Sequence, residues 1–202
     1  MRRRAELRHR FTLAERWVHR TTAVLMGVCL ATAACLYLAP LAELVGDRPL
    51  VVTVHVWCGL ALPVPLLLGL ASRALRADAA RLSRFTPADR QWLRAVRTRS
   101  TGRPAGKFNA GQKLYAQWTL GTMLVIVGTG LLMWLTGLTP PAWRVGATFV
   151  HDWLAAGIAV VVVGHVRMAW RDPEARLGMR TGWVDRRWAE REHPQWRSMG
   201  PE

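Results

Sequence analysis

The sequence predicts an all-α integral membrane protein, a bundle of four spanning helices with short amphipathic helices at the interface. Two observations lead to this prediction. The chain of 202 residues is 51% hydrophobic and yet carries a formal net charge of +15, because apolar runs alternate with arginine-rich connections. The apolar runs are also long enough to cross a hydrocarbon layer of about 30 Å. We predict one domain over residues 1–202, with spans at residues 17–39, 50–72, 114–138 and 148–170.

The first apolar run follows a basic lead, Met1–Arg16. A basic start before an apolar run also occurs in secretory signal peptides, and residues 31–33 (ATA) resemble a cleavage site. However, this run is longer than a signal core, and three further runs follow it. We therefore expect the first run to be retained as a span. A short turn over residues 40–49 leads to the second run.

The second run contains Pro63 and Pro65, where a kink is tolerated if neighbouring helices cover the freed carbonyls. The arginine-rich segment 73–113 then forms the longest connection between two runs. In it, residues 86–89 (TPAD) predict a helix start, with a hydroxyl cap, a proline in the first turn and an acid. The following residues 91–97 are expected on the membrane surface.

In the third run, Gly128 and Gly130 leave room for a close-packed helix or for a flat cofactor. The distribution of basic residues predicts the orientation. They crowd the N-terminus, the 73–113 connection and the tail at residues 171–202, whereas the two short turns hold only Arg48 and Arg144. By the positive-inside rule both termini lie in the cytoplasm, and we expect a multi-pass protein of the bacterial plasma (inner) membrane.

Four histidines lie within the predicted spans. His151 and His165 are fourteen residues apart on the fourth span, which places them about 21 Å apart and on one face of the helix. His19 opens the first span at its inner end, and His55 opens the second span near its outer end. The topology therefore predicts an inner pair, His19 with His165, and an outer pair, His55 with His151.

Two such pairs suit two haem b groups, because each iron takes two axial nitrogens and the porphyrin replaces apolar side chains in the bundle. Zinc fits less well, since structural zinc sites need four clustered ligands. A proton relay would need a continuous file of ionisable groups, which the uncharged middle of the fourth span interrupts. Four unrelated membrane histidines, each bonded to its neighbours, remain the alternative.

Other features of the sequence narrow the chemistry. The cysteines form no C-x-x-C-H motif, so a haem would not be attached covalently. The positive charge does not indicate a nucleic-acid partner, because neither a basic helix nor an aromatic RNA-binding platform is evident. His9 and His193 lie in basic polar segments, and we expect both to be solvated.

Several motifs relate the chain to a known family. They are ERWVHR at 15–20, VHVWCG at 54–59, GKFNAGQK at 106–113, VHDW at 150–153 and GHVRMAW at 164–170. With them, the sequence resembles the cytochrome b (gamma) subunit of membrane-bound formate dehydrogenases, in the diheme cytochrome b561-like superfamily, from about Arg10 to Trp196. The histidines alone would also fit the cytochrome b subunit of a hydrogenase or another iron–sulfur dehydrogenase. A haem-free membrane anchor is the alternative from another class.

The resemblance implies that His19, His55, His151 and His165 are the axial ligands of two haem b irons. It also implies two partner chains: an iron–sulfur subunit, and a molybdenum or tungsten catalytic subunit that oxidises formate. Electrons would pass from the outer haem to the inner haem and on to menaquinone or another quinone. The chain would then be an electron-transfer and quinone-reducing subunit, with no dehydrogenase active site, surrounded by membrane lipid and able to form a higher oligomer.

The resemblance further implies a quinone pocket beside the inner haem, formed by Asn109 and Gly111 with Gln112 close by. The residue types agree with that role. Asn109 and Gln112 offer amide donors to a quinone carbonyl, and Gly111 permits a close approach to the backbone. The alternative is that this segment is simply the entry to a helix, with Asn109 near its cap.

Overall fold

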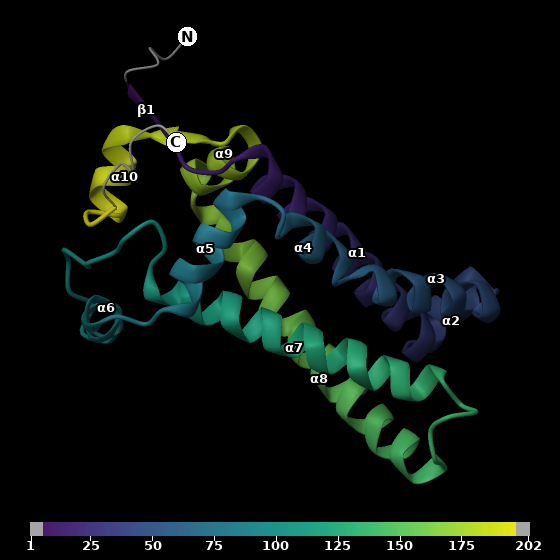
Figure 1. The fold of residues 1–202 in the computed structure, drawn as a ribbon. Helices are drawn as coiled ribbons and strands as arrows, with labels where there is room; N and C mark the ends of the chain where they lie inside the picture. The colour runs from purple at the N-terminus through teal and green to yellow at the C-terminus, as the bar shows by residue number, and fades with distance from the viewer. Residues whose placement is uncertain (1–5, 197–202) are drawn as a thin grey trace. The chain divides into compact units, whose positions relative to one another are not determined.

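The computed structural model describes residues 6–196; residues 1–5 and 197–202, the outer ends of the predicted basic lead and tail, lie outside the described residues. Most of the described chain is helical (Figure 1). In chain order the elements are β1 (Leu7–His9), α1 (Leu13–Tyr37), α2 (Ala39–Val45), α3 (Arg48–Ala61), α4 (Val64–Gly69), α5 (Arg73–Ser83), α6 (Pro87–Arg97), α7 (Ala110–Trp134), α8 (Pro141–Arg171), α9 (Pro173–Thr181), β2 (Trp183–Asp185) and α10 (Arg186–Glu192).

Four helical segments are long and apolar enough to cross a membrane: α1, the α3–α4 segment Arg48–Gly69, α7 and α8. The shortest has 22 residues, which at about 1.5 Å each is enough for the hydrocarbon layer. The predicted all-α membrane fold is therefore confirmed. Each segment begins before the predicted span, because residues that precede each apolar run also adopt the helical conformation.

The second span consists of two helices, because α3 ends at Ala61 and α4 begins at Val64. Proline has no backbone N–H and clashes with the preceding turn, so Pro63 interrupts the helix here. Leu62, at the break, is only 2% exposed and packs with Cys29 and Met123 in an apolar cluster. The interruption is thus held by packing between spans.

Residues 40–49, which the sequence predicted as a turn, contain the short helix α2. Pro40 lies in its first turn, where the missing N–H costs nothing. Gly46 ends the helix in the left-handed conformation, with φ of +67°, a common arrangement at helix C-termini.

The basic connection 73–113 contains two helices. The first, α5, was not predicted. The second, α6, begins at Pro87 as the sequence predicted, with Thr86 and Asp89 forming a capping box. In this arrangement the Thr86 N–H and hydroxyl both donate to Asp89 Oδ2, at 2.7 Å each, which satisfies groups that the helix itself leaves unpaired.

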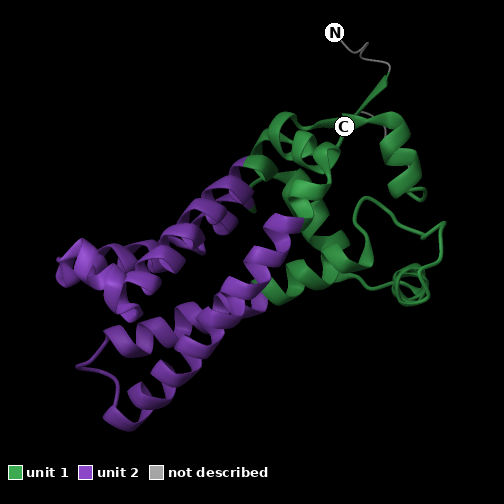
Figure 2. Cartoon of the chain, turned by 180° about the vertical axis from the view of Figure 1, so that it is seen from behind, with its two compact units in different colours: residues 1–16, 70–119, 168–202 green, residues 17–69, 120–167 purple. Residues whose placement is uncertain are grey.

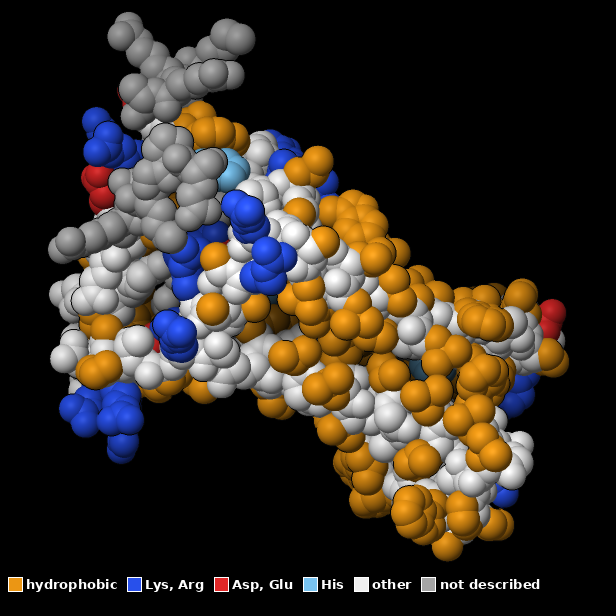
Figure 3. Space-filling model, viewed as in Figure 1, with side chains coloured by type: hydrophobic (Ala, Val, Ile, Leu, Met, Phe, Trp, Pro, Cys, Tyr) orange, Lys and Arg blue, Asp and Glu red, His pale blue; other side chains and the backbone are white. Residues whose placement is uncertain are grey.

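The described chain forms two compact units, shown in Figure 2. Of the described residues, unit 1 holds 6–16, 70–119 and 168–196, and unit 2 holds 17–69 and 120–167. Large apolar side chains are exposed on the helices of unit 2, among them Val160 and Trp153. Hydrophobic side chains are orange in Figure 3. A surface of this kind suits lipid acyl chains better than water.

Unit 1 contains a small two-stranded sheet and its own core. Strands β1 and β2 pair antiparallel, with His9 opposite Trp183. Val184 of β2 forms a buried cluster with Trp188 and Ala189 of α10. Because β1 precedes the first span and β2 follows the last one, this pairing joins the two ends of the described chain.

Candidate functional site

The four predicted histidines lie in unit 2 and come together as two pairs. The ring centroids of His19 on α1 and His165 on α8 are 6.2 Å apart. Those of His55 on α3 and His151 on α8 are also 6.2 Å apart. His19 is exposed, and the other three histidines are half-buried. Helix α8 therefore contributes one imidazole to each pair.

Each histidine of the His55–His151 pair has a threonine hydroxyl at its Nδ1 atom. Thr32 Oγ1 lies 2.8 Å from His55 Nδ1, and Thr129 Oγ1 lies 3.1 Å from His151 Nδ1. In both cases Nδ1 is engaged, so Nε2 is the nitrogen that remains for a ligand. Sequence reasoning missed both threonines, since nothing in a single span shows which neighbouring side chain will reach a ring.

The predicted quinone residues lie at the start of α7 in unit 1. Asn109 and Gln112 bond to one another's backbone: the Asn109 N–H donates to Gln112 Oε1 at 3.0 Å, and the Gln112 N–H donates to Asn109 Oδ1 at 2.9 Å. The amide NH₂ groups take no part in this reciprocal cap. A Cβ on Gly111 would lie 3.3 Å from the Trp92 ring, so the glycine allows this ring to pack here.

A cavity of about 250 Å³ lies near this segment. Asn109, Gly111 and Gln112 do not line it. The lining residues come from α5, the following connection, the segment before α7 and the first turn of α7: Arg81, Arg84, Thr86, Gly106, Lys107, Phe108 and Lys113. Residues that flank the predicted quinone residues in the sequence line this cavity. The predicted quinone residues themselves do not line it.

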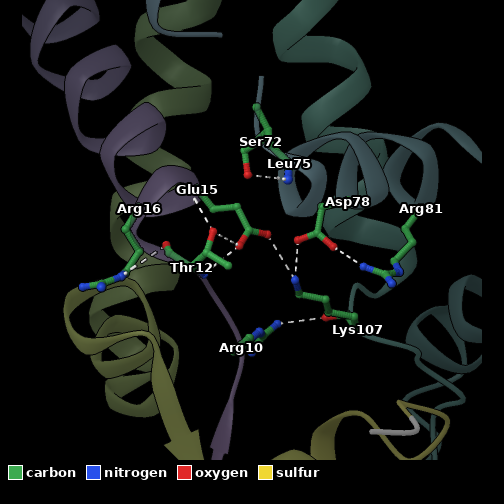
Figure 4. A network of polar contacts seen from close by, with 9 residues as sticks. All are labelled: Arg10, Thr12, Glu15, Arg16, Ser72, Leu75, Asp78, Arg81 and Lys107. Atoms are coloured by element: carbon green, nitrogen blue, oxygen red, sulfur yellow. Dashed lines mark hydrogen bonds and ion pairs between the residues drawn. The ribbon is translucent and has the colours of Figure 1, made fainter. Parts of the chain in front are cut away.

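A buried ion cluster in unit 1 was not predicted (Figure 4). Lys107 Nζ lies 3.2 Å from Glu15 Oε1 and also forms an ion pair with Asp78. Arg81 pairs with the other oxygen of Asp78 at 2.6 Å. Burial and a hydrogen bond with Glu15 raise the pKa of Asp78 to about 6, although Lys107 opposes this shift. The cluster joins the start of α1, α5 and the segment that precedes α7.

His193 does not lie in solvent as the sequence predicted, because it is only 3% exposed. Its Nδ1–H donates to the Gly106 carbonyl at 2.7 Å, and its Nε2 accepts from the guanidinium of Arg10 at 3.1 Å. The expectation of solvation was based on the basic polar segment around it in sequence, whereas its burial depends on Arg10, a distant residue that is itself buried. The other histidine of this group, His9, is exposed as expected.

Comparison with known proteins now identifies the family. The model of the prokaryotic cytochrome b561 family matches residues 10–198, which is nearly the whole chain. The chain belongs to this family. Together with the four candidate spans, this makes it a multi-pass membrane protein.

Over part of its length, this cytochrome b561 family member is also similar to formate dehydrogenase subunits. It is 33% identical over 96 residues to the formate dehydrogenase cytochrome b556 subunit of Haemophilus influenzae, covering 45% of this chain and 40% of that protein. Two Escherichia coli relatives are the nitrate-inducible cytochrome b556(Fdn) subunit, 32% identical over 96 residues, and the cytochrome b556(fdo) subunit, 27% identical over 95 residues. These matches cover 45% of this chain and 43% and 44% of the two relatives, less than half of either.

Membership of the cytochrome b561 family implies that the chain binds haem b. The spacing of the two histidine pairs fits haem. Two metal–imidazole bonds of about 2 Å, with roughly 1 Å more from each nitrogen to its ring centre, give a centroid separation of about 6 Å. Both pairs have a separation of 6.2 Å. Among residues 6–196, no group of three or more His, Cys, Asp or Glu side chains is placed to hold a metal ion. Two opposed imidazoles are therefore a donor set that suits haem better than zinc.

Proposed function

We propose that this chain is the diheme cytochrome b subunit of a respiratory formate dehydrogenase, anchored in the bacterial inner membrane with both termini in the cytoplasm. Its partners would be an iron–sulfur electron-transfer subunit and a molybdenum or tungsten catalytic subunit. The observation that carries the proposal is the pair of equal imidazole separations on one shared helix. The names of the similar proteins support the assignment to formate dehydrogenase.

In this proposal His19 and His165 hold the inner haem, and His55 and His151 hold the outer haem. When bound, the haems would carry single electrons from the outer side toward the inner side. The contribution of the chain is to present two neutral imidazoles at each site and to keep water away with apolar helices. A fixed pair of nitrogens at each site reduces the rearrangement that a change of iron charge would otherwise require.

The electron acceptor would be menaquinone or another quinone, bound at the inner side with Asn109, Gly111 and Gln112. Reduction of one quinone to quinol takes two electrons and two protons. The amide NH₂ groups of Asn109 and Gln112 are outside their reciprocal cap, so they can donate to a quinone carbonyl. The protons would come from the cytoplasmic side.

A hydrogenase or another iron–sulfur dehydrogenase is the second candidate for the parent complex. The family description is not specific to formate, and the relatives match less than half of their own length. The same histidine pairs would serve either complex. The identity of the subunits that co-purify with the chain therefore discriminates between the two candidates.

The direct test is the haem content of the purified complex. We expect reduced-minus-oxidised spectra with b-type bands and two haems for each copy of the chain. One haem or none would refute the diheme assignment. A preparation without haem would instead support the alternative of a haem-free membrane anchor.

The substitution His165→Ala tests the pairing. It should remove the inner haem and quinone-linked activity, while the outer haem remains reducible by the electron donor. His9→Ala is the matched control, since His9 is exposed and belongs to neither pair, and it should retain both haems. Loss of the outer haem in His165→Ala would show that the pairing is wrong.

A further inference from the structure

We infer that Thr32 and Thr129 are positioning residues that fix the tautomer, the orientation and the donor strength of the outer histidines. This inference rests on the proposed function, in which His55 and His151 ligate a haem. The threonines belong to spans other than those of the histidines they contact. Thr32 on α1 meets His55 on α3, and Thr129 on α7 meets His151 on α8.

The direction of each hydrogen bond follows from counting protons. Thr32 Oγ1 lies 2.8 Å from the carbonyl of Val28 and 3.0 Å from that of Cys29, in its own helix. A carbonyl can only accept, so the single hydroxyl proton of Thr32 is donated to the helix. The hydroxyl oxygen then accepts from the Nδ1–H of His55.

The same arrangement recurs at the second histidine. Thr129 Oγ1 lies 2.8 Å from the carbonyl of Val125 and 3.1 Å from that of Ile126. Its oxygen therefore accepts from the Nδ1–H of His151. In both rings the proton is on Nδ1 and the lone pair is on Nε2, which is the form that binds a metal.

The neighbour of Thr129 also constrains the second ring. A Cβ on Gly130 would lie 3.4 Å from His151 Cε1, so the ring packs closely against the α7 backbone at this point. The hydroxyl of Thr129 and the backbone at Gly130 thus hold the imidazole on two sides. A ring held in this way keeps the same Nε2 direction in both iron oxidation states.

Donation of the Nδ1–H to a neighbouring oxygen raises the basicity of a metal-bound imidazole. A more basic ligand stabilises the ferric state relative to the ferrous state. Loss of either hydroxyl should therefore move the midpoint potential of the outer haem in the positive direction. Only the difference in hydrogen-bond strength between the two oxidation states shifts the potential, so the net strength of an ordinary neutral hydrogen bond sets an upper bound of roughly fivefold on the change in the ferric–ferrous equilibrium.

The experiment compares Thr32→Val and Thr129→Val, which remove the hydroxyl at nearly constant volume, with Thr32→Ser and Thr129→Ser, which keep it. Thr148→Val is the matched control, because Thr148 Oγ1 donates to the Arg144 carbonyl of its own helix at 2.9 Å in the same way. The readouts are a potentiometric titration of both haems and the low-temperature EPR spectrum of the ferric state. The haem that His55→Ala loses is assigned as the outer one.

We expect each valine variant to shift the potential and the EPR signal of the outer haem alone, with serine restoring both. If both haems bind in the valine variants with unchanged potentials, the inference is overturned. If valine abolishes outer-haem binding, recovery by serine supports the inference, and failure of serine overturns it by showing that the methyl group mattered. The absence of haem from the unsubstituted protein would refute the proposed function instead.

Discussion

His193 is buried although its neighbours in the sequence are basic and polar. The ring accepts a hydrogen bond from Arg10 through Nε2, so it must be neutral to make this contact. Burial and the charge of Arg10 lower the pKa of His193 to about 4, and burial lowers the pKa of Arg10 to about 10. Protonation of the ring would place two cations in contact and remove the acceptor.

The stability of unit 1 should therefore depend on pH. Between pH 6.5, the usual pKa of histidine, and about 4 the unfolded chain binds a proton that the folded chain does not. The stabilisation is present above 6.5 and is lost as the pH falls toward 4, by about 3 kcal/mol in all. Hydrogen exchange of the α10 amides should show this loss. The effect should vanish in His193→Asn, which can still donate to Gly106, and persist in His9→Asn; an unchanged profile in His193→Asn would contradict it.

At the scale of elements, the ion cluster of unit 1 joins three segments that are far apart in the chain. The Thr12 N–H and hydroxyl bond to Glu15 Oε2 at 2.6 and 2.7 Å, which caps the start of α1. The other oxygen of Glu15 faces Lys107, which also pairs with Asp78 of α5. A single ammonium group thus lies between two buried carboxylates.

Removal of that ammonium group should destabilise unit 1 strongly. Lys107→Met leaves Glu15 buried without a paired cation and leaves Asp78 with Arg81 alone, and breaking a buried pair in this way costs about 3–5 kcal/mol. The triple variant that adds Glu15→Gln and Asp78→Asn should recover most of the loss. Opening free energies from hydrogen exchange provide the measurement. Arg186→Ala is the control, because its partner Glu190 is exposed and the pair is worth less than about 1 kcal/mol; an equal effect in both variants would refute the prediction.

For the whole molecule, the distribution of 28 Lys and Arg residues predicts the orientation in the membrane. Unit 1 contains the basic 73–113 connection, which the positive-inside rule assigns to the cytoplasm. The segments that follow α1 and α7 belong to unit 2, and each carries a strongly exposed leucine: Leu44 on α2 is 81% exposed and Leu138 is 82% exposed.

Cysteine labelling tests this orientation in intact cells. A membrane-impermeant maleimide should label Leu44→Cys and Leu138→Cys from outside. Arg94→Cys on α6 should react only after the membrane is permeabilised. The unsubstituted chain, with Cys29, Cys35 and Cys58 in its spans, supplies the background. Labelling of Arg94→Cys in intact cells would reverse the predicted orientation.

The sequence was most informative where a feature repeats along one helix. The spans follow from apolar length, and the meeting of His151 with His55 and of His165 with His19 follows from helical spacing combined with span order. The contact of Thr32 with His55 depends on the rotation and depth of two helices, which no single span encodes.

In unit 1, contacts between residues far apart in the chain could not be predicted from the sequence. The burial of His193 depends on contacts with residues near the start of the chain and before α7, so its basic sequence neighbours gave the wrong expectation. The cap formed by Asn109 and Gln112 is, by contrast, local: a capping residue followed three positions later by glutamine is a pattern that sequence alone can indicate. The roles of these residues toward a quinone stay predictions.

The sharing of α8 between both histidine pairs has a consequence for biogenesis. Synthesis proceeds from the N-terminus, so His19 and His55 enter the membrane well before their partners on the last span. Neither pair exists until α8 is inserted, and the hydroxyl of Thr129 arrives only shortly before it. Under the proposed function, stable haem capture would therefore be a late step that reports complete insertion of the chain. Chains whose synthesis stops before α8 would lack both histidine pairs. Bound haem would therefore distinguish complete chains from incomplete ones.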